Sequence, residues 1–138
     1  ALGADATVRL DAHDDLAGAL REAAGGGVDV TLDPLWAEPA VAAIGAANPF
    51  ARHVALGQSA GAEATIPSGA VRSTPVSIVG HTNYAADLER RRAAYQRMAA
   101  HAAAGEIRVD VERVPLEDVA DAWRRQGSSP NRKLVIVP

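Results

Sequence analysis

Apolar residues recur along the chain with two alternating periods. Short β-branched and aliphatic runs predict strands, and longer stretches with apolar residues three or four apart predict helices. The expected strands are residues 6–10, 28–33, 53–57, 76–80, 109–114 and 133–137. The expected helices are residues 14–27, then 40–48 between Pro39 and Pro49, then 87–105 and 116–126. Strand and helix therefore alternate along the sequence.

Three of these strands, at 28–33, 53–57 and 76–80, are nearly continuous apolar runs. Strands of a parallel sheet covered by helices on both faces need such runs, so the expected fold class is α/β. Residues 58–75 contain too much Gly, Ser, Thr and Pro for a helix, and leave room only for a short edge strand interrupted by Pro67.

Two of the helices have an expected inward face. In the first, this face consists of Leu16, Ala19, Leu20 and Ala23, and three glycines end the helix. In the helix at 87–105, the longest, the inward residues are Leu88, Tyr95, Met98, Ala99 and Ala102, with Gly105 beyond its end. Both faces are expected to pack against other elements.

Composition narrows the class of protein. The chain has 138 residues, of which 48% are hydrophobic and 22% are charged, so it is long enough for a globular domain with a core. It has no cysteine, which excludes thiolate chemistry and is consistent with a cytoplasmic location. The net charge is −3 and no apolar run reaches membrane-spanning length, so we expect neither a nucleic-acid partner nor a membrane partner.

Residues 57–61, Gly-Gln-Ser-Ala-Gly, match the G-x-S-x-G pattern of a serine nucleophile on a turn between strand and helix. No helix is expected behind Ser59. Asp87 and His101 would complete a triad in order, but they lie fourteen residues apart on one expected helix, about 21 Å at 1.5 Å per residue. A serine hydrolase is therefore a remote alternative.

Three expected strands end in polar or glycine-bearing segments, at 33–36, 57–61 and 80–84. In open α/β sheets ligands bind outside the carboxyl ends of the strands, and glycine lets a flat ligand approach the backbone. The same residue types also form ordinary turns. The spacing alone leaves a nucleotide crevice and simple turns equally open.

Five segments, in order, resemble the carboxyl-terminal part of the medium-chain dehydrogenases/reductases, the superfamily of zinc alcohol dehydrogenases and quinone oxidoreductases. They are LGAD at 2–5, GGGVDVTLDPLW at 25–36, ARHVALGQSAG at 51–61, TPVSIVGHTNY at 74–84 and RVPLEDVADAWRRQGSSPNRKLVIVP at 113–138. The sequence departs from the pattern at Asp33-Pro34-Leu35-Trp36, where a glycine-bearing turn is usual, at Trp123 and at Arg132.

The resemblance implies an incomplete Rossmann-type sheet in residues 1–105, and a strand-helix-strand tail in 106–138 that returns to the catalytic domain of a longer protein. It implies binding of NADP or NAD, and hydride transfer to or from a small-molecule alcohol, aldehyde, enone or quinone. The implied cofactor-binding residues are Leu56, Gly57, Gln58, Ser59, Val79, Gly80, His81 and Arg132. The catalytic residues are unknown.

Two further expectations concern what the segment does alone. No strand-G-x-G-x-x-G-helix pattern occurs in the 138 residues, so the segment by itself is expected to be inactive and to bind little dinucleotide. His13, His53 and His101 lack ligand spacing, so no metal is expected. Residues 76–80 would form an edge strand, which favours a homodimer through residues 65–80 and a non-catalytic assembly module as the alternative function.

Overall fold

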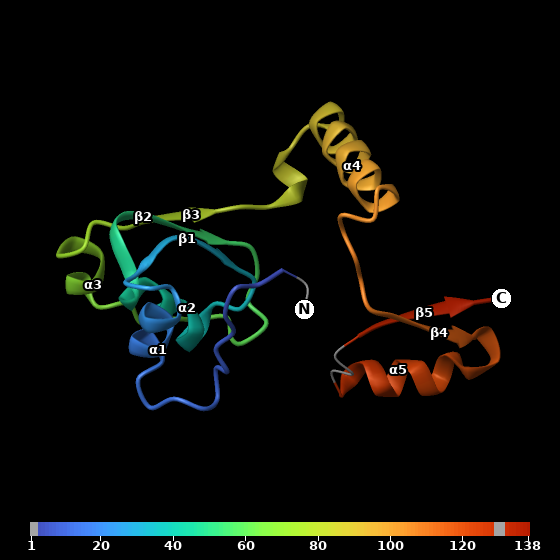
Figure 1. Ribbon diagram of the computed structural model, residues 1–138, viewed down its shortest axis with the longest axis horizontal. Helices are drawn as coiled ribbons and strands as arrows, with labels where there is room; N and C mark the ends of the chain where they lie inside the picture. The colour runs from blue at the N-terminus through green and yellow to red at the C-terminus, as the bar shows by residue number, and fades with distance from the viewer. Residues whose placement is uncertain (1–2, 129–131) are drawn as a thin grey trace. The chain divides into compact units, whose positions relative to one another are not determined.

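The computed structural model describes residues 3–128 and 132–138, and the chain divides into two compact units (Figure 1). The first unit is Ala1–Asp87 and the second is Leu88–Pro138. Each unit contains its own parallel sheet. This confirms the α/β fold class. The boundary expected between residues 105 and 106 refers to domains of a longer protein and stays a prediction.

The first unit is built on a three-stranded parallel sheet in the order β1-β2-β3. The strands are β1 (Val28–Asp33), β2 (Ala47–Ala55) and β3 (Ser77–Gly80). The helices are α1 (Leu16–Ala23), α2 (Ala37–Gly45), the short α3 (Ser68–Arg72) and the 3₁₀ turn η1 (Asn83–Ala85). Because the strands are parallel, their carboxyl ends lie along one rim of the sheet.

Helix α2 forms the core of this unit together with the sheet. It packs against β1 and β2, and α1 packs against α2 (Figure 1). Ala40 and Ile44 of α2 are buried, as are Ala51 and His53 of β2. The other face of β1, which carries Leu32, is not packed against any described helix, since Leu32 is 66% exposed. The alternation of strand side chains thus separates a packed face from a bare face.

The strand expected at residues 6–10 is absent from the structure. A strand needs a hydrogen-bonded neighbour, and no described strand pairs with this segment. The segment instead turns, and Arg9 binds Asp11 through two hydrogen bonds of 3.1 and 2.8 Å. This exposed pairing lowers the pKa of the Asp11 carboxyl.

Residues 47–80 differ from expectation in two places. β2 begins at Ala47, so Pro49 lies inside the strand, where the pairing with β1 shifts register between Val28 and Val30. This bulge accommodates Pro49, which has no N–H to give to a ladder. Residues 68–72 form helix α3, where an edge strand was expected, because Pro67 has extended backbone angles that start the first turn.

Helix α1 is shorter than expected. Asp15 caps its start, and the Oδ1 atom of Asp15 accepts a hydrogen bond of 2.9 Å from the amide of Gly18. Leu16 is buried as expected, but Ala23 is exposed. The glycines after the helix have positive φ angles, which end it as expected.

The second unit contains a two-stranded parallel sheet and two helices. Its elements are α4 (Leu88–Ala103), β4 (Val111–Pro115), the 3₁₀ turn η2 (Leu116–Asp118), α5 (Val119–Gly127) and β5 (Lys133–Val137). Val114 and Ala122 are its buried residues among those described. Helix α4 confirms the longest expected helix, and Gly105 follows it with a φ of 74°.

The inward face expected for α4 is wrong. Its members Leu88, Tyr95, Met98, Ala99 and Ala102 are all exposed. Periodicity identified the helix correctly, but it cannot supply a surface for the apolar face to pack on. No described element covers these side chains.

Candidate functional site

An open hollow of about 530 Å³ lies at the carboxyl ends of β1 and β2 in the first unit. Its lining comes from the loop after β1, from the end of β2 and from the loop after β2. The lining residues are Trp36, Ala55, Gly57, Gln58 and Ala62. The hollow lies where parallel α/β sheets bind their ligands.

Asp33, the last residue of β1, joins both loops. Its Oδ1 atom accepts hydrogen bonds from the amides of Leu35 at 2.8 Å and Trp36 at 3.0 Å. Its main-chain oxygen accepts from the amides of Leu56 at 2.7 Å and Gly57 at 3.3 Å. One residue therefore fixes the turn into α2 and the first two residues after β2.

Further hydrogen bonds connect the loops to each other. The amide and the hydroxyl of Ser59 both donate to the carbonyl of Pro34, each at 3.2 Å. The amide of Ala60 donates to the carbonyl of Leu35 at 2.9 Å. The hydroxyl of Ser59 thus serves the loop contact, and no described histidine or carboxylate is hydrogen-bonded to it. The geometry gives no support to a serine nucleophile.

Gly57 allows the loops to approach this closely. A Cβ atom at this position would lie 2.7 Å from the carbonyl oxygen of Pro34, which is closer than real Cβ atoms come. Gly80, at the end of β3, has open space where its Cβ would lie. The two glycines expected at the rim therefore differ, because only Gly57 is required by contact with another main chain.

The turn into α2 has an unusual backbone. Trp36 and Ala37 have φ angles of 60° and 53°, in the left-handed region that favours glycine. A glycine-bearing turn is usual here in the family that the sequence resembles. The turn keeps a glycine-like conformation while an indole occupies the position. The hydrogen bonds from Leu35 and Trp36 to Asp33 hold it.

The expected cofactor-binding residues of the first unit all lie on one rim. Gly57 and Gln58 line the hollow, and Leu56 and Ser59 flank them in the same loop. β3 runs beside β2 with Gly80 opposite Ala55, and the amide of His81 donates to the carbonyl of Ala55 at 2.9 Å. Val79, Gly80 and His81 are thus one strand away from the hollow. Their role as cofactor ligands stays a prediction.

Arg132 lies in the second unit. Its guanidinium is 3.8 Å from the carboxylate of Glu112 on β4, which also binds Arg125 at 2.6 Å. The bond to Glu112 raises the pKa of Arg125. Arg132 is half exposed, so its guanidinium has room to contact a phosphate while it stays close to Glu112. Its expected contact with a cofactor phosphate stays a prediction.

Sequence reasoning missed His53 and the function of Asp33. The Nε2 atom of His53 lies 3.1 Å from the Oδ2 atom of Asp33, and both side chains are buried. Each is one of several polar residues in its strand, so its residue type alone did not distinguish it. Without the strand register, nothing in the sequence shows that they face each other.

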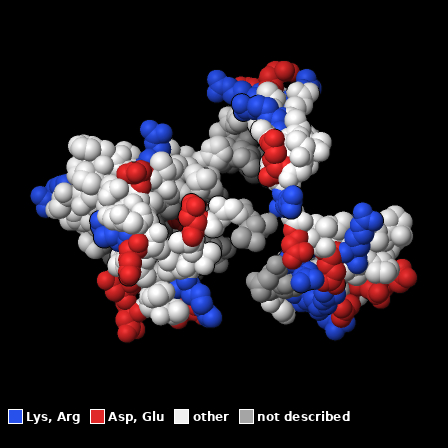
Figure 2. All heavy atoms as spheres, viewed as in Figure 1, with Lys and Arg blue, Asp and Glu red and all other residues white. Residues whose placement is uncertain are grey.

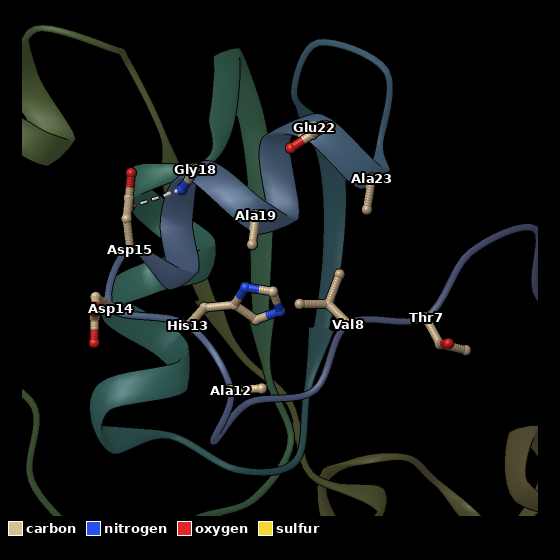
Figure 3. A pocket seen from close by; sticks show the side chains of 10 residues that line it. All are labelled: Thr7, Val8, Ala12, His13, Asp14, Asp15, Gly18, Ala19, Glu22 and Ala23. Atoms are coloured by element: carbon tan, nitrogen blue, oxygen red, sulfur yellow. Dashed lines mark hydrogen bonds between the residues drawn. The ribbon is translucent and has the colours of Figure 1, made fainter.

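A second hollow, of about 750 Å³, lies between residues 7–15 and helix α1 (Figure 3). The imidazole of His13 points into it, between Val8 and Ala19. Asp15 turns toward the amide of Gly18, to which it is hydrogen-bonded. The polar groups here are those of a loop and a helix cap, and we assign no ligand to them.

Comparison with known families agrees with this architecture. The sequence model of the zinc-binding dehydrogenases matches residues 2–136. The chain belongs to this family. None of the curated proteins matches the chain in sequence.

Solved structures show how much of a zinc-binding dehydrogenase fold the chain contains. An NAD-dependent alcohol dehydrogenase is 29% identical, with a TM-score of 0.77 over 99% of this chain and 38% of its own. An alcohol dehydrogenase zinc-binding domain protein from Burkholderia ambifaria is 21% identical, with a TM-score of 0.79 over 99% of this chain and 37% of its own. The Escherichia coli quinone oxidoreductase, complexed with NADPH, is 22% identical, with a TM-score of 0.72 over 91% and 41%. The chain thus spans about two fifths of each.

The family name raises the question of zinc. The chain has no cysteine, and residues 3–128 and 132–138 contain no group of three or more histidine, aspartate or glutamate side chains arranged to hold a metal. The donors described here do not fit a zinc site. No step of the proposed function therefore runs through a metal, and the expectation that this segment holds no metal stays a prediction.

Surface properties add little to the choice of partner. Charges of both signs are interspersed on the face shown in Figure 2, without a large basic patch. Within the described residues, no helix is long and apolar enough to cross a membrane. The expectation of no nucleic-acid partner and no membrane partner stays a prediction.

Proposed function

We propose that this chain supplies the nicotinamide end of the coenzyme site in an NAD(P)-dependent dehydrogenase or reductase. The observation that carries the proposal is the hollow formed by Trp36, Gly57 and Gln58 at the rim of a parallel sheet. Membership of the zinc-binding dehydrogenase family supports it. The proposed reaction is hydride transfer to or from an alcohol, aldehyde, enone or quinone in the cytoplasm.

The lining residues would bind and orient a flat ring. Gly57 has no side chain, so a ring can lie against its backbone. The amide of Gln58 can donate to and accept from a carboxamide, and the indole of Trp36 offers an aromatic face. When bound, nicotinamide supplies or accepts the hydride, and the protein contributes position and electrostatics.

We expect the choice between NAD and NADP to depend on residues that bind the adenosine end of the coenzyme, away from this hollow. Solved relatives support a nicotinamide coenzyme in general, since one is described as NAD-dependent and two are complexes with NADPH. We propose that Val79, Gly80 and His81 face the same coenzyme, and that Arg132 contacts a phosphate. The small-molecule substrate would bind mainly outside this segment.

Reduced nicotinamide mononucleotide tests the proposed site directly in this chain. At millimolar concentration it should shift the amide signals of Gly57 and Gln58 and the indole signal of Trp36 in NMR spectra. Trp123, an exposed indole in the second unit, is the internal control and should not shift. Shifts at Trp123 as large as those at Trp36, or none at either, would contradict the proposal.

Whole dinucleotides should bind this chain only weakly. The 138 residues contain no glycine-rich turn for the pyrophosphate, so we expect a Kd for NADPH or NADH weaker than about 1 mM. Isothermal titration measures it, and no turnover is expected. Micromolar affinity would show that the chain forms a complete coenzyme site by itself.

A second candidate function, an assembly module, has one observation in its favour. β3 pairs only with β2 among the described strands, and its side chains Ile78 and Val79 are 40% and 43% exposed. An apolar edge strand is a template for pairing with another chain. We propose a homodimer through residues 65–80 on this basis.

Sedimentation velocity tests the dimer. The wild-type chain should sediment as a dimer at micromolar concentration, and Ile78→Lys should sediment as a monomer because a charge on an edge strand opposes pairing. Ser77→Thr, which adds no charge, should stay dimeric. A monodisperse wild-type monomer would contradict the dimer and leave the coenzyme site unaffected.

A further inference from the structure

Asp33 and His53 are the buried polar residues among those described. Asp33 is 4% exposed and His53 is 2% exposed, and the Nε2 and Oδ2 atoms that join them are 3.1 Å apart. They come from neighbouring strands, β1 and β2, and Asp33 is hydrogen-bonded to both loops that form the hollow.

Both oxygens of the Asp33 carboxylate have hydrogen-bond partners. The Oδ2 atom is paired with the Nε2 atom of His53, which donates to it in the tautomer that carries the ring proton on Nε2. The other oxygen accepts from the amides of Leu35 and Trp36. The buried carboxylate therefore has three hydrogen-bond partners, as buried polar groups in proteins generally need.

His53 also contacts the hollow from below. Its ring centroid lies 6.2 Å from that of Trp36, with the planes tilted by 57°. Ala55, two residues further along β2, lines the hollow itself. His53 is therefore in contact with one wall of the hollow through Trp36 and with both loops through Asp33.

We infer that Asp33 and His53 are a positioning pair that fixes the two loops around the hollow at their observed separation. Asp33 binds the loop after β1 by its side chain and the loop after β2 by its main-chain oxygen. His53 acts through Asp33, by restricting the rotation of the carboxylate. The importance of the pair for coenzyme binding rests on the proposed function.

Packing alone does not account for His53. Its Nδ1 atom is buried and has no hydrogen-bond partner among the described residues, which is unfavourable by itself. If His53 only filled space, an apolar side chain of similar size would leave the amides of the two loops as protected from exchange as they are in the wild type, although Asp33 would lose one partner. The two roles therefore predict different results for His53→Leu.

Amide hydrogen exchange on the 138-residue chain separates these roles. In His53→Leu, the amides of Leu35, Trp36 and Gly57 should exchange at least about tenfold faster, because Asp33 loses one of the bonds that hold it. Amides of the β2–β3 ladder are the reference and should change less than about twofold. In His53→Gln, whose side-chain amide can still donate to Asp33, the loop amides should return to within about threefold of wild type.

Fluorescence gives an independent signature of the same effect. In a Trp123→Phe background, Trp36 is the remaining tryptophan of the chain. Acrylamide should quench Trp36 more strongly in His53→Leu than in wild type or His53→Gln, since the loop that carries the indole opens more often. Equal quenching in all three would overturn the positioning role.

Two exchange patterns would also overturn it. One is equal acceleration of the loop and ladder amides, which means that His53 stabilises the whole unit. The other is unchanged exchange in His53→Leu, which means that His53 only fills space. If His53→Leu does not fold, His53→Asn replaces it, because asparagine keeps an amide but is one methylene too short to reach Asp33.

The coenzyme proposal fails separately. Reduced nicotinamide mononucleotide, added to wild type and to each variant, reports on the hollow. Loop-specific exchange without any nicotinamide shift in the wild type would support the positioning pair and contradict the proposed function. Nicotinamide shifts that persist unchanged in a His53→Leu variant with unchanged exchange would support the function and overturn the pair.

Discussion

At the scale of the residue, Gly57 lies where the loop after β2 contacts the main chain of the loop after β1. The absent side chain allows the main chain after β2 to reach the carbonyls of Pro34 and Asp33, and it leaves bare backbone beside the hollow. Both effects follow from the absence of a Cβ atom, which allows the contact between the loops and would allow a ring to lie against the backbone. A substitution here tests the first effect without any ligand.

Gly57→Ala should destabilise the chain by about 1–3 kcal/mol, because the new Cβ would lie 2.7 Å from the carbonyl oxygen of Pro34 and the loops would have to separate. Urea denaturation followed by circular dichroism measures the loss. Gly80→Ala is the matched control: no atom lies within 4 Å of its Cβ position, so the change should stay within about 0.5 kcal/mol. Equal losses in both variants would contradict this account.

Single residues of the site were partly predictable. Gly57 and Gln58 were identified because a glycine loop follows an apolar run. In the sequence Trp36 is only a departure from a glycine-bearing turn, since a left-handed backbone angle on a tryptophan has no signal in sequence. The contact of His53 with Asp33 depends on β1 and β2 being in a particular register, which is a tertiary property.

At the scale of the element, helix α1 shows how one side chain sets a boundary. Asp15 accepts from the amide of Gly18, one of the amides without an intrahelical partner at a helix start. Its neighbour Asp14 is equally charged and exposed, but does not cap the helix. Comparing Asp15 with Asp14 therefore distinguishes the capping hydrogen bond from the general effect of a negative charge near the start of a helix.

Asp15→Ala should lower the free energy of unfolding by about 1 kcal/mol, since it removes the cap. Asp14→Ala should cost no more than a few tenths of a kcal/mol. Thermal unfolding of both variants beside the wild type measures the difference. A larger loss in Asp14→Ala would place the start of the helix elsewhere than at Leu16.

Elements with strong local patterns were predictable, and elements that depend on partners were not. The strands at 28–33, 76–80 and 133–137 begin and end within a residue of expectation, because each contains several β-branched residues within a short segment. Residues 6–10 also contain β-branched residues, but no described strand pairs with them. β2 begins six residues before its expected start because a bulge admits Pro49, which sequence patterns treat as a boundary.

At the scale of the whole molecule, the two compact units have separate sheets. All described strand pairs of β1, β2 and β3 lie within the first unit, and the β4–β5 pair lies within the second. A chain that ends at Asp87 should therefore keep the three-stranded sheet. Its amide spectrum should overlay that of the same residues in the full chain. Loss of dispersed signals in the shortened chain would show that the first unit needs the second to fold.

The fold class was predictable at this scale, because an alternation of strands and helices with apolar strands specifies a parallel sheet. The division after Asp87 was not, because α4 carries a helical pattern whose apolar side finds no described partner. In the solved relatives, the part that matches this chain makes up about two fifths of a longer chain. Whether the apolar side chains of α4 are covered depends on other elements, which the sequence of the helix does not specify.

The bare face of β1 has a consequence for handling the protein. Val30 and Leu32 are 61% and 66% exposed, and β1 pairs with β2 alone among the described strands, so its second edge is open. An apolar stripe on an unpaired edge is the combination from which cross-β fibrils grow. Concentrated solutions should form thioflavin-positive aggregates after a lag, and a lysine in place of Leu32 should lengthen that lag.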